Sequence, residues 1–205
     1  MRLTPKPEPA LLALDTEVAA GWWWYDGKTT HRLMIFVGQW FRPDGTTPMP
    51  PFGWILMPDV IMDGLTLKAK AAYRGLPIRH RRDALHLIRS TIADADVLVG
   101  HNLTGFDLGT INGELMLQNM PLLPVRETID TLNDGPKGVF QQRSLGTRLS
   151  RLEGTVDKPK VEPVVWEAAF NDFDATALRE VWERAVIDVQ GHIDLFVNDR
   201  ERSYV

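Results

Sequence analysis

An uninterrupted apolar run in the middle of the chain constrains the fold more than any other feature. The run, ADVLVGHN at residues 95–102, follows a segment at 81–94 whose apolar positions Leu85, Ile88 and Ile92 have helical spacing. A short strand that is apolar on both sides is typical of a parallel sheet covered by helices. The pattern therefore predicts an α/β architecture.

Three strands are predicted before that run. The first is at residues 10–17, the second is HRLMIFVGQWF at 31–41, and the third is FGWILM. The segment DGKTT supplies a turn before the second strand, and PDGTTPMPP forms a loop before the third. Three strands in succession predict an antiparallel meander that opens a mixed sheet.

The second half of the chain alternates predicted helices and strands. We expect a helix at about 107–119, a short strand in RETIDTL, and a short helix in RSLGTRLSRLEG that Gly154 ends. The last helix, at 174–198, begins at the N-cap residue Asp174. Its apolar stripe consists of Leu178, Trp182, Ala185, Val189 and Phe196.

Composition bounds the domain count and excludes several chemistries. The 205 residues suffice for one α/β domain, which we place at 10–200 after a disordered, proline-rich lead-in at 1–9. The absence of cysteine excludes a thiolate nucleophile and cysteine-ligated zinc, and it suits a reducing cytoplasm. No signal-peptide pattern or membrane-length apolar run is present, so we expect a cytoplasmic protein with no membrane partner.

Charge is unevenly distributed along the chain. The net charge of −4 argues against a general nucleic-acid coat protein. The segment KAKAAYRGLPIRHRR at 68–82 is nevertheless strongly basic, and Arg143, Arg148 and Arg151 fall close together. Such patches either hold a phosphate backbone or form a solvated surface, and the sequence leaves both open.

Acidic residues occur at the ends of several predicted elements. Asp15 and Glu17 have the i, i+2 spacing that points both carboxylates to one face of a strand. Two like charges there repel each other, so a divalent cation is a natural compensation, although such pairs also arise by chance. Asp107 is expected to face the sheet from a helix start, with helix capping as the alternative. Asp188 lies near the apolar stripe and needs a core cation or a metal as partner.

These motifs also follow one another in a specific order. Asp-x-Glu lies in the first strand, GHNLTGFDLGTI follows a middle strand, TIDTL precedes RSLGTRL, and an Asp-Val pair lies in the last helix. In this order they resemble the DEDD (DnaQ-like) superfamily of 3′-5′ exonucleases. That superfamily has an RNase H-like fold and includes proofreading subunits, the exonuclease domains of DNA polymerases and ribonuclease D relatives. The resemblance is greatest to the polymerase type and runs from about residue 10 to 198.

The resemblance implies a site, a reaction and partners. Asp15, Glu17, Asp107 and Asp188 would hold two Mg²⁺ or Mn²⁺ ions roughly 3.5–4 Å apart. The enzyme would hydrolyse single-stranded nucleic acid from its 3′ end to nucleoside monophosphates, with DNA preferred because the second motif looks like that of DNA polymerases. We expect a bacterial or phage nuclease of DNA replication and repair, with a replication protein as a further partner. The alternatives are an exoribonuclease and a catalytically silent module that binds nucleic-acid ends.

The last helix departs from the family pattern. Family members carry a Tyr four residues before the final Asp or a His five before it, and here those positions are Arg184 and Glu183. Three explanations stay open: metal activation of water suffices, Glu183 or His192 acts as the base, or strand ends are bound without cleavage. Arg184 is predicted to contact the scissile phosphate, with a surface ion pair as the alternative.

Further substrate contacts are predicted around the first two motifs. Trp22 and Trp23 directly follow the first acids, where exposed rings would stack on bases. Their alternative is packing in a hairpin or in the core. Thr16, Asn102 and Phe106 are the remaining predicted contacts. Asn102 either orients substrate or a ligand carboxylate, or ties down its own loop.

Overall fold

One mixed sheet forms the centre of the molecule. The structure is a computed structural model that describes residues 9–19, 24–25, 28–29, 32–47, 49–133, 144–150 and 160–202. Within these residues a six-stranded sheet has the order β6-β5-β4-β1-β7-β8. Its strands are β1 (Leu11–Ala19), β4 (Arg32–Phe41), β5 (Phe52–Met57), β6 (Ile78–His80), β7 (Val97–Gly100) and β8 (Glu127–Asp130). A separate ribbon pairs β2 (Trp24–Tyr25) with β3 (Lys28–Thr29).

Strand directions confirm the predicted meander and mixed sheet. β1 pairs with β4, and β4 with β5, in antiparallel fashion. β7 runs parallel to both β1 and β8, and β6 runs parallel to β5. All the strands that the sequence predicted are present. β6 was not predicted, because three residues are too few to show a period of two.

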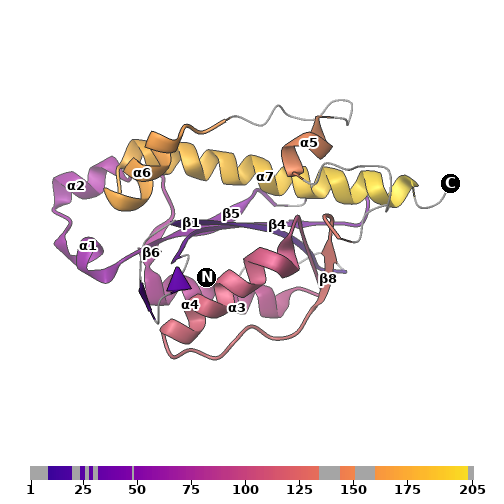
Figure 1. Ribbon diagram of the computed structural model, residues 1–205, viewed down its shortest axis with the longest axis horizontal. Coiled ribbons are helices and arrows are strands. Elements are labelled where there is room, and N and C mark those ends of the chain that lie inside the picture. The colour runs from indigo at the N-terminus through magenta and orange to yellow at the C-terminus, as the bar shows by residue number, and fades with distance from the viewer. Residues whose placement is uncertain are drawn as a thin grey trace.

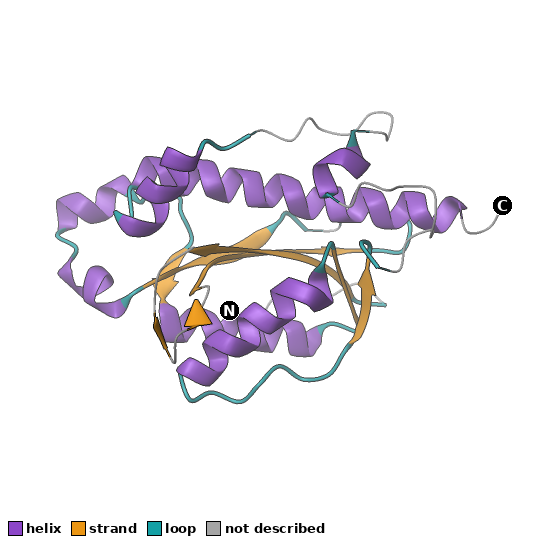
Figure 2. Cartoon of the chain, in the orientation of Figure 1, coloured by secondary structure: helices purple, strands orange, loops and turns teal. Residues whose placement is uncertain are grey.

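Helices cover both faces of the sheet, as Figures 1 and 2 show. On one face lie α5 (Leu145–Leu149), α6 (Pro163–Asn171) and α7 (Ala175–Arg202). On the other face lie α3 (Arg81–Asp94) and α4 (Leu108–Leu117). The short helices α1 (Asp59–Gly64) and α2 (Leu67–Ala72) connect β5 to β6. The result is a single α/β domain, consistent with the predicted RNase H-like fold.

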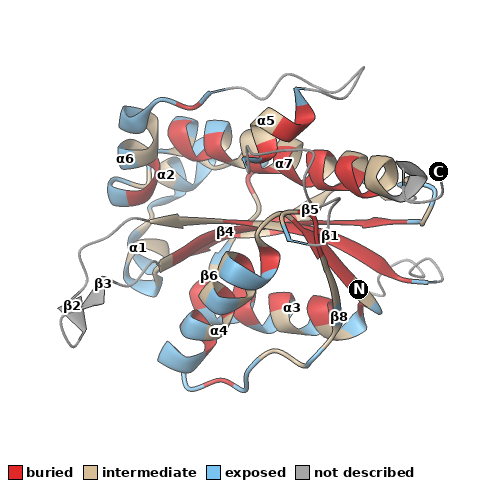
Figure 3. Ribbon diagram, turned by 45° about the vertical axis from the view of Figure 1, so that its right-hand side comes forward, coloured by how far each residue is buried: buried red, intermediate tan, exposed pale blue. Residues whose placement is uncertain are grey.

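Alternation along β1 divides the core into two layers. Leu11 and Ala13 pack in the cluster that includes α7, whereas Leu12 and Leu14 pack in the cluster that includes α3 and α4. Figure 3 shows the buried stretches of β1 and β4 between these layers; burial along β1 is complete from Leu11 to Leu14 and partial at most positions after them. Each residue of β1 therefore belongs to one face or the other, which fixes the direction of the acids that follow.

Several helix boundaries differ from those predicted. The helix expected from residue 107 is preceded by a π-helical turn, η1 (Leu103–Asp107), and α4 itself ends at Leu117. α5 ends at Leu149, and Gly154 lies outside the described residues. α1, α2 and α6 were not predicted. α1 and α2 have six residues each and bury none, so they carry no apolar stripe to detect.

The last helix begins as predicted and extends further. Asp174 Oδ1 accepts hydrogen bonds from the backbone N–H groups of Thr176 and Ala177 at 3.0 and 2.9 Å, as expected of an N-cap. α7 then continues to Arg202, beyond the predicted end at 198. No helix within the described ranges is both long and apolar enough to cross a membrane.

The basic residues have different environments. In the segment at 68–82, Lys68, Lys70, Arg74, Arg79 and Arg82 are exposed, but Arg81 is buried. Arg148 is also buried, where it donates to the Thr131 carbonyl and pairs with Asp199 at 2.7 Å. Arg143 and Arg151 lie outside the described residues.

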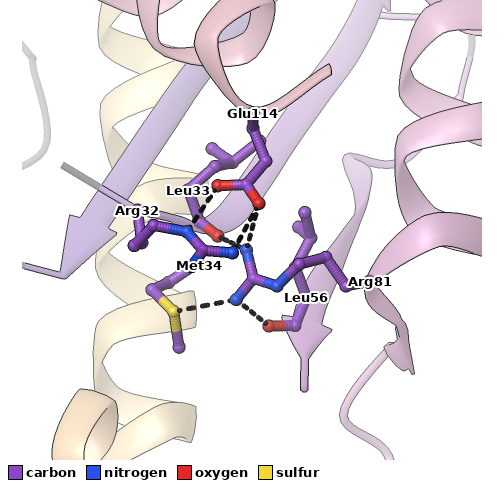
Figure 4. Close-up of polar contacts among 6 residues, drawn as sticks. All are labelled: Arg32, Leu33, Met34, Leu56, Arg81 and Glu114. Carbon is purple, nitrogen blue, oxygen red and sulfur yellow. Dashed lines mark hydrogen bonds and ion pairs between the residues drawn. The ribbon is translucent and has the colours of Figure 1, made fainter. Parts of the chain in front are cut away.

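An ion-pair network joins α4 to the sheet (Figure 4). Glu114 of α4 is 2% exposed and accepts from Arg32 Nε and Nη2 at 2.9 and 2.8 Å. Arg81 Nη1 lies 3.2 Å from the same carboxylate. Arg81 also donates to the carbonyls of Leu33 and Leu56 at 2.7 and 3.2 Å. One buried carboxylate is thus held between two guanidinium groups.

Candidate metal centre

The first two acids lie where β1 extends past its neighbour. Pairing between β1 and β7 covers Leu11–Ala13, so Asp15 and Glu17 lie beyond it. Their odd positions continue the face of β1 that packs under α7. Carboxyl ends of strands in open α/β sheets commonly form ligand sites, because the connecting chains diverge there.

The third acid comes from α7, which crosses β1 on that face. Asp188 is 3% exposed, as expected from its position near the apolar stripe. One carboxylate oxygen each of Asp15, Glu17 and Asp188 lies within 4.8 Å of the others. Oxygen-only, anionic ligands suit hard cations such as Mg²⁺ or Mn²⁺. These three side chains therefore fit the predicted cofactor in ligand type and spacing.

Asp107 is buried and does not belong to this group of three. It is 2% exposed, and the hydroxyl of Thr16 donates to Asp107 Oδ1 at 2.6 Å. Asp107 makes no capping hydrogen bond to α4, so the capping alternative was wrong. Burial raises the pKa of Asp107 from 3.8 to about 7, although the hydrogen bond from Thr16 opposes that shift.

The loop before Asp107 has a strained turn. Asn102 has a φ of 66°, in the left-handed region where asparagine is tolerated. A Cβ atom at Gly105 would lie 2.5 Å from Oδ1 of Asn102, so the glycine gives the Asn102 side chain room to lie against its own loop. These contacts favour the local, loop-fixing role among the alternatives given for Asn102. Phe106, the other predicted contact in this loop, is partly exposed.

Asp130 fixes the same loop and was missed by the sequence reasoning. Its carboxylate accepts from the backbone N–H groups of Asn102 and Thr104 at 2.9 and 3.1 Å, and from the Thr104 hydroxyl at 2.8 Å. Burial raises the pKa of Asp130, but these and further hydrogen bonds outweigh that effect and the net shift is downward. Asp130 ends the predicted strand that contains TID, and this strand runs parallel to β7. An acid at that position could have been predicted to lie near the loop after β7.

The two predicted bases have different surroundings. His192 is 1% exposed, and its Nδ1 lies 3.0 Å from the Leu14 carbonyl, which assigns the hydrogen to Nδ1. Its Nε2 lies 3.9 Å from Asp15 Oδ1. Glu183 is exposed on α7 and, five residues before Asp188, lies about 140° around the helix from it. His192 therefore adjoins the acids, and Glu183 points away from them.

Arg184 lies one helical turn before Asp188, where the motif resemblance leads us to expect a tyrosine. Its Nη2 lies 3.6 Å from Asp188 Oδ2, so the predicted ion pair exists, although Asp188 is a buried acid rather than a surface one. Its guanidinium carbon lies 5.1 Å from the ring centroid of Trp166 on α6. Trp166 was not among the predicted residues. Trp22 and Trp23 lie outside the described residues.

Comparisons with known proteins bear on the fold. No protein-family model matches the chain, and its sequence matches no curated protein. Among solved structures, the chain is similar to the family B DNA polymerase from the hyperthermophilic archaeon Pyrobaculum calidifontis, with a TM-score of 0.62 and 15% identity. The similarity covers 95% of this chain and 25% of the polymerase chain, so this chain spans about a quarter of its length. At this identity the similarity shows the fold alone.

Proposed function

We propose that the protein is a divalent-metal-dependent 3′-5′ exonuclease. In this proposal it hydrolyses single-stranded DNA from the 3′ end and releases nucleoside monophosphates. The observation that carries the proposal is the mutual approach, within 4.8 Å, of carboxylates from Asp15, Glu17 and Asp188. These are three of the four acids that the motif resemblance implies.

The structural neighbour supports the choice of DNA. It is a DNA polymerase, and the exonuclease domains of DNA polymerases belong to the superfamily that the motifs resemble. The similarity extends over 95% of this chain.

In this proposal the chain's own side chains bind the metal ions and order the site around them. Asp15, Glu17 and Asp188 would hold one cation. Asp107, which the resemblance implies as the fourth ligand and which lies beside Thr16, would help to hold a second. A bound Mg²⁺ or Mn²⁺ lowers the pKa of water and neutralises negative charge on the phosphate. His192 orders the site through its contacts with Leu14 and Asp15. As a base, His192 is better placed than Glu183, which faces solvent.

A polarity assay tests the proposal. Purified protein is incubated with single-stranded DNA or RNA labelled at the 3′ or the 5′ end, in Mg²⁺, Mn²⁺ or EDTA. We expect mononucleotide from 3′-labelled DNA at once, and a descending ladder from 5′-labelled DNA, both abolished by EDTA and by Asp15→Ala. Glu180→Ala, which removes an exposed acid from α7, is the matched control and should leave the rate unchanged.

The alternatives predict other outcomes in the same assay. Faster release from RNA than from DNA would make the protein an exoribonuclease. Binding of strand ends without turnover in either metal would make it a silent module. Release from the 5′ end would contradict both nuclease proposals.

A further inference from the structure

The guanidinium of Arg184 is held between an aromatic ring and an acid of the candidate site. Its carbon lies 5.1 Å from the Trp166 ring centroid, which is within the range of a cation–π contact. One terminal nitrogen lies 3.6 Å from Asp188, too far for a good hydrogen bond. Trp166 is itself packed against Phe170, with ring centroids 5.4 Å apart. The ring therefore has a fixed place on α6.

One buried donor of Arg184 lacks an acceptor in the described part of the chain. Nε is buried and makes no hydrogen bond within the described part of the chain. A buried donor without a partner costs about 1–3 kcal/mol, so such groups commonly mark a place where a ligand supplies the acceptor. The side chain as a whole is 20% exposed, so Arg184 is not sealed in the core although Nε is buried. Nε and a terminal nitrogen together form the fork that binds two oxygens of a phosphate.

We propose that Arg184 binds the phosphate group being cleaved and that Trp166 is the positioning residue that holds its guanidinium for this contact. The inference rests on the proposed function, since it places the phosphate beside Asp188. A tyrosine or histidine base is replaced here by a permanent positive charge, which cannot accept a proton but can stabilise charge on phosphate oxygens. Trp166 acts only through Arg184.

The contact with Asp188 has a second consequence. A guanidinium beside a metal-ligating carboxylate repels a divalent cation and competes with it for that carboxylate. Removal of Arg184 should therefore strengthen metal binding while it weakens turnover. A purely structural arginine would change both in the same direction, through loss of the folded site.

The experiment combines Mn²⁺ calorimetry with kinetics on single-stranded DNA. The variants are Arg184→Gln, Arg184→Lys, Trp166→Leu, Trp166→Phe and the double variant Arg184→Gln with Trp166→Leu. Arg179→Gln is the control, because it removes an equal charge from the same helix at a residue that donates to the Arg74 carbonyl, away from the acids. Thermal unfolding of each variant reports whether it is folded.

Opposite changes in the two measurements would support the proposal. Arg184→Gln should bind Mn²⁺ several-fold more tightly and lose about 100-fold in kcat. Arg184→Lys should lower kcat less, because lysine keeps the positive charge but not the paired N–H donors of the guanidinium. Trp166→Leu should lower kcat about tenfold, and Trp166→Phe should lower it less. In the double variant, Trp166→Leu should lower kcat little further than Arg184→Gln alone does.

Either of two results would overturn it. One is an Arg184→Gln enzyme whose Mn²⁺ affinity and kcat either match those of Arg179→Gln or both fall together. The other is a Trp166→Leu loss that is equally large with and without Arg184, because Trp166 would then act independently. A folded wild type that neither binds Mn²⁺ nor degrades DNA would instead overturn the proposed function.

Discussion

Two acidic sites, one on each face of the sheet, differ in how the protein compensates their charge. On the α4 face, the carboxylate of Glu114 lies between Arg32 and Arg81, with contacts of 2.8 to 3.2 Å. On the α7 face, three carboxylates approach one another within 4.8 Å, and the arginine beside them pairs with Asp188 at the longer distance of 3.6 Å.

The difference separates a structural site from a candidate functional one. A buried acid that is fully paired by arginine fastens elements together and has no need of a ligand. Three converging carboxylates repel one another and are best balanced by a divalent cation. The first three predictions below each distinguish these two sites, and the fourth concerns the buried acid Asp107, which lies outside both.

The largest effect is expected from Asp188→Asn. Loss of this metal ligand should reduce mononucleotide release about a thousandfold, which corresponds to about 4 kcal/mol of transition-state stabilisation. The metal-free protein should not be destabilised, because one of three repelling charges is gone. Activity and urea unfolding measured on the same preparation check both halves. A variant with near-normal activity would show that the acids are not the reaction centre.

Glu114→Ala should have the opposite profile. It leaves the buried Arg81 without its carboxylate, so we expect a loss of about 3–5 kcal/mol in the free energy of unfolding. Glu114→Gln keeps two polar atoms in the side chain, so its free energy of unfolding should fall less. Urea unfolding beside Glu180→Ala, an exposed acid, gives the comparison. Equal stability of the Glu114 and Glu180 variants would remove the structural role assigned to the network.

Metal should stabilise the folded protein through the site of Asp15, Glu17 and Asp188 and not through Glu114. Mn²⁺ at 100 times its dissociation constant should raise the free energy of unfolding by about 2.7 kcal/mol. The gain should vanish in Asp15→Asn and persist in Glu114→Gln, as urea unfolding with and without Mn²⁺ would show. A gain that survives in Asp15→Asn would place the metal elsewhere.

The smallest effect is the pH dependence of Asp107. Its pKa is raised by burial from 3.8 to about 7, so the folded state holds this proton more tightly than the unfolded chain does. Its contribution to stability is therefore lost as pH rises from about 4 through 7. Asp107→Asn carries no such proton and should gain about 2 kcal/mol relative to wild type between pH 5 and pH 8. Urea unfolding of both proteins without metal at pH 5 and pH 8 measures this gain. The same difference in free energy of unfolding between variant and wild type at both pH values would contradict the prediction.

The sequence predicted most of the fold because the main strands and α7 are long enough to show their periods. β1, β4 and β7 are apolar runs with clear ends, and α7 has both a cap and a stripe. Short elements without buried residues gave no such signal, which is why α1 and α2 were missed.

The candidate site divides in the same way. The common direction of Asp15 and Glu17 follows from alternation in one strand, and the burial of Asp188 follows from its place on one helix. Contacts between distant segments carry no local pattern. The hydrogen bond from Thr16 to Asp107 spans 91 residues, and the ring of Trp166 reaches Arg184 from another helix.

The central claim is that Asp15, Glu17 and Asp188 together bind a divalent cation. A crystal of the protein soaked in Mn²⁺, with anomalous diffraction recorded near the manganese edge, tests it most directly. We predict an anomalous peak within about 2.0–2.3 Å of carboxylate oxygens from all three residues, as hard divalent cations require. A well-ordered site with no peak between these carboxylates, or a peak bound elsewhere that Asp15→Asn does not remove, would contradict the account.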